Sequence, residues 1–335
     1  MNRLTIHLIV SFIILLLASC SNNNRRSILS IKNASFEKKQ ISRGNNRPNS
    51  IIYENYIDVL FVALYYGKSV DEIKHSLGWE EHKVKEKIDL LIENNMLTDI
   101  DGVYIPTVFV LPLKEGNRLK DESLPIANEI ADSIVAIVDN TIELHNKMDI
   151  AKQYSFKELS FFYLSNILLD MGQIGNVESL FLKKERPLRH GKNYYLAIME
   201  KDTSKREEAF GIYGNHGLLN NDSIYVGIYG NRRYLEAGWD DYKNKKVYCF
   251  SKHDYNILFK ELNNLFRPTL INILEKNKVQ FESLFNEYGY TGKISFEEYF
   301  IWYYHLIYTE ATNNLIDRKV IEKPESGVFY YQIEK

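Results

Sequence analysis

The feature that most limits what this chain can fold into is an apolar run near its start, Leu4 to Ser19, followed directly by Cys20. The run is about 16 residues long, whereas a membrane-spanning helix needs roughly 20. It begins behind a single basic residue, Arg3, and ends in small residues. This layout is typical of a secretory signal peptide, so we expect residues 1–19 to be removed during export.

The end of the run, Leu17-Ala18-Ser19 before Cys20, resembles the lipobox of bacterial lipoproteins. The resemblance implies that Cys20 is diacylated and becomes the new N-terminus. Two acyl chains hold a protein stably at a bilayer, because each buried methylene contributes about 0.8 kcal/mol. It also implies lipid anchoring to the bacterial cell membrane or outer membrane, with the body outside the cytoplasm. The residues after Cys20 are not an acidic surface-export tag, so we expect the body to face the periplasm.

The alternative is an uncleaved signal anchor. Basic residues from Arg25 to Arg47 follow the apolar run, and Glu37 is the only acid among them. A basic flank tends to stay in the cytoplasm, which would place the body inside the cell. The two interpretations therefore predict opposite locations for the same chain.

Composition places the body among ordinary globular proteins. The chain has 335 residues, of which 45% are hydrophobic and 26% charged, and its length allows about two domains. A net charge of -2 gives no overall attraction to nucleic acid or anionic lipid. Only Cys20 and Cys249 are cysteines, so lipidation of Cys20 excludes an intrachain disulfide. Cys249 lies in the apolar run 246–251, and we expect it to be a buried core thiol.

The pattern predicts an α+β fold with five parts after the signal peptide. Residues 20–50 are polar and rich in Asn and Ser, which predicts a lipidated flexible tether. Residues 114–175 predict connecting amphipathic helices, and residues 176–251 a mixed, mainly antiparallel β region. Residues 252–335 predict a helical region, with a buried aromatic helix around 299–308, that ends in a β-hairpin. This last arrangement suggests a second winged-helix-like unit.

The remaining part, residues 51–113, predicts three helices, the second of them short, followed by a hairpin. Ser69 and Glu72 have the spacing of a capping box, and Gly78 ends the short helix. This order resembles a winged helix-turn-helix domain, which implies a third helix that enters the DNA major groove. However, the acids of the third helix and the hairpin turn outnumber its three lysines. These residues are Lys83, Lys85 and Lys87 against Glu80, Glu81, Glu86, Asp89, Glu93, Asp99 and Asp101. We therefore expect a docking module and no nucleic-acid binding.

A ligand site is suggested in the β region, where the pentapeptide Gly-Ile-Tyr-Gly-Asn occurs at 211–215 and again at 227–231. We interpreted each copy as the end of a strand followed by a turn. Polar residues near these turns form the candidate ligand-binding set, Arg189, His190, His216, Arg232 and Arg233. If the turns share one sheet edge, these side chains converge and suit a phosphate or carboxylate. The alternative is a set of exposed, solvated charges.

The sequence carries no P-loop and no HExxH arrangement, so we expect no catalytic residues, metal or cofactor. The function we expect is a membrane-anchored envelope lipoprotein that docks an unknown protein or binds a small anionic ligand. Two alternatives remain open. One is a membrane-anchored winged-helix transcription regulator, and the other is a small-anion-binding enzyme or sensor centred on the two pentapeptides.

Overall fold

Regular secondary structure begins closer to the N-terminus than the sequence pattern predicts. The computed structural model describes residues 26–335 except 45, 47, 49 and 234–241; the predicted signal peptide and Cys20 lie outside the described residues. Helix α2 (Ile28–Lys32) is capped by the side chain of Ser27 and buries its two isoleucines. Strand β1 (Ser35–Ile41) follows and pairs antiparallel with β7 (Tyr195–Lys201). The prediction of a flexible tether is therefore wrong for residues 28–41, because β1 finds its partner far along the chain, where no local pattern reveals it.

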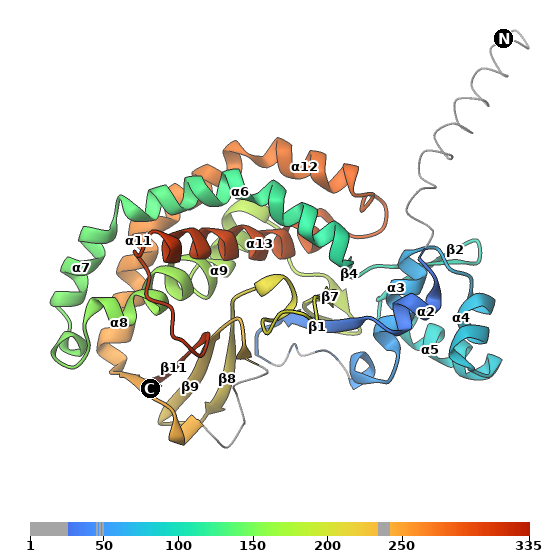
Figure 1. The fold of residues 1–335 in the computed structure, drawn as a ribbon, viewed down its shortest axis with the longest axis horizontal. Coiled ribbons are helices and arrows are strands. Elements are labelled where there is room, and N and C mark those ends of the chain that lie inside the picture. Colours follow the sequence, from blue (N-terminus) through green and yellow to red (C-terminus); the bar gives the residue numbers. More distant parts are fainter. Residues whose placement is uncertain (1–25, 45, 47, 49, 234–241) are drawn as a thin grey trace, which may run out of the picture.

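The smaller lobe is built from the helices and the hairpin that the sequence predicts (Figure 1). Ser69 and Glu72 form the expected capping box, with the amide of Glu72 donating to Oγ of Ser69 at 3.2 Å. Gly78 ends the short helix in the left-handed region at φ +67°. The elements are α3 (Ile57–Tyr65), α4 (Val70–Leu77), α5 (Glu81–Glu93), β2 (Leu97–Ile100) and β3 (Val103–Pro106). A 3₁₀ turn at Ser50–Tyr53 precedes them.

A three-stranded sheet joins the smaller lobe to the body. After the hairpin, strand β4 (Phe109–Leu111) runs parallel to β7, whose other edge holds β1. Alternate side chains point to opposite faces of a strand, so the sheet serves two cores. Val110 and Ile198 pack in the core of the smaller lobe, whereas Phe109 and Met199 pack in the core of the body. The sheet is thus a wall shared by the two lobes.

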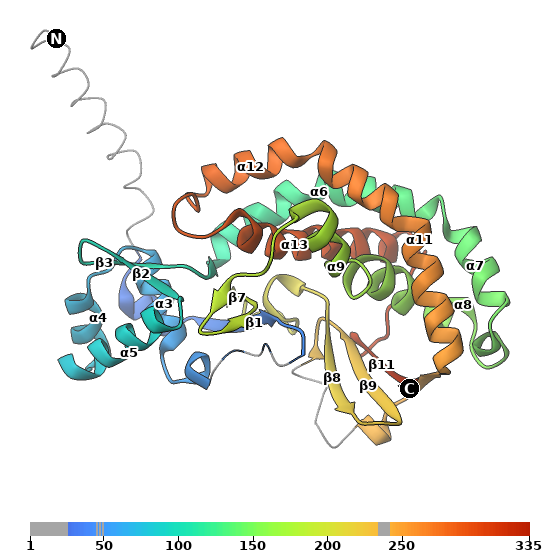
Figure 2. The same ribbon diagram turned by 180° about the vertical axis from the view of Figure 1, so that it is seen from behind.

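The body is mainly helical, and its centre is the aromatic helix α13 (Phe296–Asp317). Tyr299, Trp302 and Tyr303 of this helix are each at most 1% exposed, which confirms the prediction of a buried aromatic helix. Helices α6 (Leu113–Val135) and α12 (Lys278–Glu287) lie above it in both views, and α11 (Lys252–Lys276) rises along one end of the body (Figures 1 and 2). The other helices are α7 (Val138–Asn146), α8 (Phe156–Ser160) and α9 (Ile174–Asn176). Pro125 lies inside α6 and Pro268 inside α11, and neither proline ends its helix.

The body contains two π-helical segments, whose turns are wider than those of an α-helix. The first is Phe161–Asp170 and the second is Val177–Leu182. At the end of the first, the amide of Met171 donates to the carbonyl of Asn166, five residues earlier, at 2.8 Å. Such segments are rare and are often found at functional sites. Here the segment ends in the buried residue Asp170.

A four-stranded sheet, in the order β10-β11-β9-β8, packs below the helices. Strand β11 pairs antiparallel with β9 and parallel with β10. Its strands are β8 (Gly214–Asn220), β9 (Ile224–Gly230), β10 (Val247–Phe250) and β11 (Val328–Glu334), and a two-stranded ribbon of β5 (Leu188–Arg189) and β6 (Lys192–Asn193) lies elsewhere. Residues 320–323 form no strand, so the predicted terminal hairpin, and with it the second winged-helix-like unit, is wrong. Cys249 is exposed on β10, which corrects the expected buried thiol.

The two pentapeptides lie on adjacent antiparallel strands, where Gly214 is paired with Gly230. The first Gly-Asn opens β8 and the second ends β9, so the first is not the predicted turn. Gly230 has φ +157°, and a Cβ there would lie 2.3 Å from the carbonyl oxygen of Gly327. Glycine is therefore required at position 230, where the backbone of β9 approaches the carbonyl of Gly327 closely. Both copies nevertheless meet at the same end of the sheet.

Candidate functional site

A cleft of about 810 Å³ opens between β1, the end of the first π-helix, the start of β8 and the middle of α13. Among the described residues that line it, five are lysine or arginine and two are acids. The basic residues are Lys38, Lys39, Arg43, Arg186 and Arg233, and the acids are Glu37 and Asp170. His216 and His305 also line the cleft. The described lining therefore carries more positive than negative charge.

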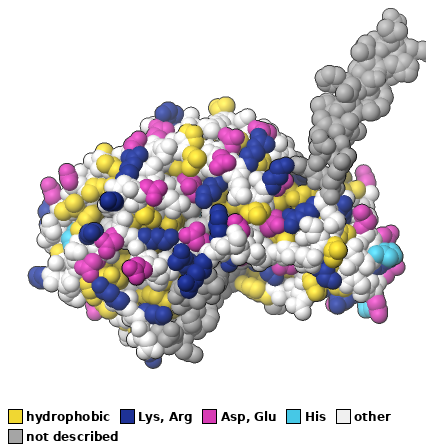
Figure 3. Space-filling view, in the orientation of Figure 1, with side chains coloured by type: hydrophobic (Ala, Val, Ile, Leu, Met, Phe, Trp, Pro, Cys, Tyr) yellow, Lys and Arg dark blue, Asp and Glu magenta, His cyan; other side chains and the backbone are white. Residues whose placement is uncertain are grey.

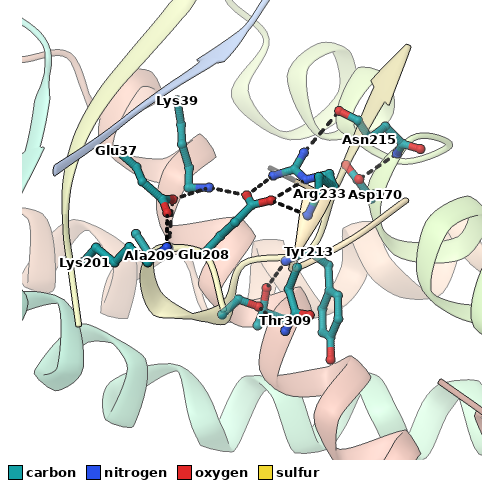
Figure 4. Close-up of polar contacts among 12 residues, drawn as sticks. Glu37, Lys39, Asp170, Lys201, Glu208, Ala209, Tyr213, Asn215, Arg233 and Thr309 are labelled. Carbon is teal, nitrogen blue, oxygen red and sulfur yellow. Dashed lines mark hydrogen bonds and ion pairs between the residues drawn. The ribbon is translucent and has the colours of Figure 1, made fainter. Parts of the chain in front are cut away.

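One wall of the cleft is fixed by the carboxylate of Glu208 (Figure 4). Nζ of Lys39 lies 2.7 Å from Oε2 of Glu208. The backbone amide and Nε of Arg233 each donate to Oε1 of Glu208 at 3.0 Å. Burial alone would raise the pKa of Glu208, but the two cations outweigh burial and lower it to about 2. Glu208 thus stays ionised and fixes the orientation of both cations.

The same ionic network continues to the N-terminal strand. Glu37 lies two residues before Lys39 on the same face of β1, and its Oε2 is 3.0 Å from Nζ of Lys39. The carboxylate of Glu37 also accepts the amide of Ala209 at 2.9 Å. Lys201 on the neighbouring strand lies 3.3 Å from Oε1 of Glu37. The cleft wall is therefore held by a chain of alternating charges that spans β1, β7 and the segment before β8.

The floor of the cleft is formed by uncharged hydrogen-bonding groups around Asp170. Nδ2 of Asn215 donates to Oδ2 of Asp170 at 2.8 Å and to Oδ1 of Asn166 at 2.7 Å. Oδ1 of Asn215 in turn accepts from Nδ2 of Asn166 and from the hydroxyl of Tyr331, both at 3.0 Å. Asn215 is thereby fully occupied and serves to position Asp170. The second residue of the Gly-Asn pair is thus a floor residue.

Two titratable groups on the floor have pKa values displaced in opposite directions. Burial raises the pKa of Asp170 to about 7, although Arg233, Asn215 and Tyr308 act to lower it. Burial lowers the pKa of His305 to about 4, and the nearby cations Lys39 and Arg233 lower it further. Nδ1 of His305 lies 2.7 Å from the carbonyl oxygen of Ile301, so the neutral ring donates from Nδ1 and leaves Nε2 as an acceptor. Near pH 7, the floor therefore holds a neutral imidazole and a carboxyl that takes up a proton more readily than an ordinary aspartate.

The carboxylates that neutralise the other basic residues lie outside the lining. Nζ of Lys38 is 3.6 Å from Asp58. Arg186 lies 2.6 Å from Glu178, and Arg43 lies 3.9 Å from the same carboxylate. Arg43 is the most open of these cations, with 64% of its side chain exposed. A bound anion would therefore meet the cationic side of each pair first.

The structure brings together two of the five residues that the sequence predicted for the ligand site. His216 and Arg233 line the cleft, and Arg186, which lies just before Arg189 in the chain, lines it as well. Arg232 does not line the cleft, because its Nη1 donates to the carbonyl of Glu325 at 3.4 Å and its side chain packs against Gly327.

The other two predicted residues lie at the joint between the lobes. Arg189 is 2% exposed and donates to the carbonyls of Asn95 (2.5 Å) and Thr107 (2.9 Å) in the smaller lobe. It also donates to Oε2 of Glu298 at 2.8 Å, at the start of α13. His190 is half-exposed and lies 3.8 Å from Glu93. Arg189 holds the hairpin against the body, His190 lies beside α5, and neither side chain lines the cleft.

Sequence reasoning missed Lys38, Lys39 and Arg43 because residues 20–50 were assigned to the tether. It also missed Asp170, which follows the apolar run 167–169, and His305, which lies within the aromatic run 299–308. A polar residue in or beside such a run is the one signal that points to them. That signal does not tell which residues of other elements they will meet.

Comparison of the chain with protein-family models, with curated proteins and with solved structures finds no match. Among the described residues, no helix has both the length and the apolarity to cross a bilayer. The site must therefore be interpreted from its own geometry.

Proposed function

We propose that this protein is an envelope lipoprotein, anchored through lipid on Cys20, whose body outside the cytoplasm binds a small anionic ligand. The anchor rests on the resemblance of residues 17–20 to a lipobox. The ligand rests on one observation, that His216 and Arg233 line one cleft together with Lys39, Arg43 and Arg186. A periplasm-facing cleft would meet small solutes from outside the cell.

The argument for an anion is electrostatic. The guanidinium of Arg233 donates to both carboxylate oxygens of Glu208, and its Nη1 also donates to the carbonyl of Asn215 at 3.2 Å. Lys39 is only 5% exposed and is equally fixed. Cations that are already oriented do not lose side-chain freedom when an anion binds, which favours binding over that by mobile surface lysines. Arg43 at the open side supplies a guanidinium that suits a carboxylate or phosphate.

For the smaller lobe, we propose a winged-helix-like domain used as a docking module. Its helices and hairpin follow the expected order. On the visible face, acidic side chains gather at the end formed by α4 and α5 (Figure 3). Lys87 pairs with Glu54, and Lys83 lies 5.7 Å from the ring centre of Trp79. This charge distribution supports a protein partner over DNA.

Anion binding is tested by calorimetric titration of the unlipidated mature chain with sulfate at pH 6.5. We expect Arg43→Gln to weaken binding about tenfold, because it removes a charge-assisted hydrogen bond from an exposed position. The matched control is Lys260→Gln on α11, whose side chain is 74% exposed and far from the cleft lining. Equal affinities in the wild type and both variants would contradict the proposed site.

Lipid anchoring is tested by metabolic labelling with a fatty-acid analogue. We expect the wild type to carry the label and Cys20→Ala to lack it. The Cys249→Ala variant is the control, since its only change is in the exposed cysteine of β10 and it should be labelled fully. Absence of label from the wild type would support the uncleaved anchor and with it a cytoplasmic body.

A further inference from the structure

The single acid on the floor of a largely basic cleft has a role that charge attraction alone does not explain. Asp170 is 6% exposed and lines the cleft, close to the position where an anion would approach Arg233. An ionised carboxylate there would repel the ligand. A neutral carboxylic acid would instead offer a hydrogen-bond donor.

We propose that the cleft takes up its anion together with a proton, and that the neutral carboxylic acid of Asp170 donates a hydrogen bond to the bound anion. This inference rests on the proposed function, because it names how that ligand is held. Asn215 donates to Oδ2 of Asp170 and the hydroxyl of Tyr308 also hydrogen-bonds this carboxyl, which lines the cleft, where its acid proton can meet a ligand. Asp170 is thus a residue that determines specificity for an anion over a cation.

The surroundings of Asp170 favour its neutral form. Burial is the largest influence and raises its pKa to about 7 despite Arg233. A second negative charge placed in the cleft would raise that pKa further, because like charges disfavour ionisation. Binding above pH 7 must therefore draw a proton from solution.

Among the titratable groups near Asp170, the tyrosines and His305 do not change state between pH 6.5 and 9, and one histidine is the exception. From α13 come Tyr304, Tyr308 and His305, from β9 comes Tyr229, and from β1 comes Lys39. The three tyrosines have pKa values raised well above the ordinary value by burial, and the pKa of His305 is lowered to about 4. Arg233 stays charged. His216 on β8 is the exception, since histidine titrates near neutral pH and requires its own control.

The test is calorimetric titration of the unlipidated mature chain with sulfate, whose charge is constant over this pH range. We expect the affinity to fall about tenfold for each pH unit above 7, because the unliganded Asp170 must first be reprotonated. Titrations at pH 8 in two buffers of different ionisation enthalpy should report the uptake of about one proton per sulfate. This count needs no variant and is therefore independent of any folding defect.

Two variants assign the proton. Asp170→Asn keeps a donor without a titrating proton, so we expect a flat pH profile and tighter binding than the wild type at pH 9. His216→Gln should keep the wild-type slope. A slope that survives in Asp170→Asn and vanishes in His216→Gln would overturn the proposal.

Titrations of the wild type distinguish a failure of the Asp170 proposal from a failure of the anion site itself. Sulfate bound with the same affinity at every pH and with no proton uptake would overturn the role of Asp170 while leaving the anion site in place. No sulfate binding at any pH would overturn both.

Discussion

Nζ of Lys39 lies 2.7 Å from Oε2 of Glu208, and the two side chains are only 5% and 1% exposed. The pair joins β1, the first strand of the fold, to the segment that leads into β8. Removing two charges from water is costly, and the cost is offset only when both partners are present and well hydrogen-bonded. Arg233 completes that compensation at Oε1. The orientation of the cleft wall therefore depends on one buried carboxylate.

Replacing Glu208 by glutamine should destabilise the fold by about 3–5 kcal/mol, because Arg233 would lose its carboxylate partner in a buried position and Lys39 would keep only Glu37. Urea denaturation measures this change. The matched control is Glu207→Gln, whose side chain is 33% exposed and lies 3.6 Å from Lys323. A surface pair contributes at most about 1 kcal/mol, so the control should lose little. Equal losses of unfolding free energy in the two variants would contradict a larger stabilising contribution from the buried network.

The same carboxylate predicts an acid limit of stability. The pKa of Glu208 is lowered from 4.5 to about 2 in the folded protein. A group with a depressed folded pKa stabilises the fold above its unfolded pKa and loses that contribution as the pH falls toward the folded value. We therefore expect about 3 kcal/mol of stability to disappear between pH 4.5 and pH 2. Denaturation curves at these pH values should show a smaller loss in Glu208→Gln.

A third prediction concerns the joint between the lobes. Arg189→Met should cost about 3–5 kcal/mol, because Glu298 and two backbone carbonyls lose their donor in a buried position. We expect faster hydrogen exchange in β2, β3 and the start of α13. His190→Ala, at the half-exposed neighbouring residue, is the control and should leave exchange unchanged. An unchanged exchange pattern in Arg189→Met would contradict the role of Arg189 in holding the lobes together.

How far the sequence predicts this fold depends on whether a pattern is local. The capping box at Ser69 and the burial of α13 follow from residues within one or two turns of each other, and both predictions are confirmed. The ordered β1 and the insertion of β11 between β9 and β10 depend on distant partners, and both were missed. Helix ends depend on packing too, because Pro125 and Pro268 locally favour a helix boundary yet both lie inside long helices that pack in the body.

For the candidate site, too, the sequence predicted some residues, and others depend on distant partners. The pentapeptides did indicate that two segments meet at one sheet end, and His216 and Arg233 do share a cleft. Arg189, His190 and Arg232 are close to them in sequence but serve the lobe joint and the turn at Gly327. Proximity along the chain therefore could not separate cleft residues from structural ones. Lys39 and Asp170 reach the cleft only through tertiary packing.

A fourth prediction links the structure to the anchor. The chain has two cysteines, and Cys249 is exposed. Partial desolvation of its thiol raises the pKa of Cys249, and Glu334 raises it further, so alkylation should be slow at neutral pH and faster as the pH rises. If Cys20 is thioether-linked, the unfolded purified protein should contain one reactive thiol. Two thiols in a quantitative titration would contradict lipidation.

The most direct test of the anion cleft is anomalous diffraction from crystals grown with selenate, a sulfate analogue. The account predicts a selenium peak inside the cleft, within hydrogen-bond distance of Arg43 or Arg233 and of Asp170. Selenium peaks found only at surface lysines outside the cleft would contradict it.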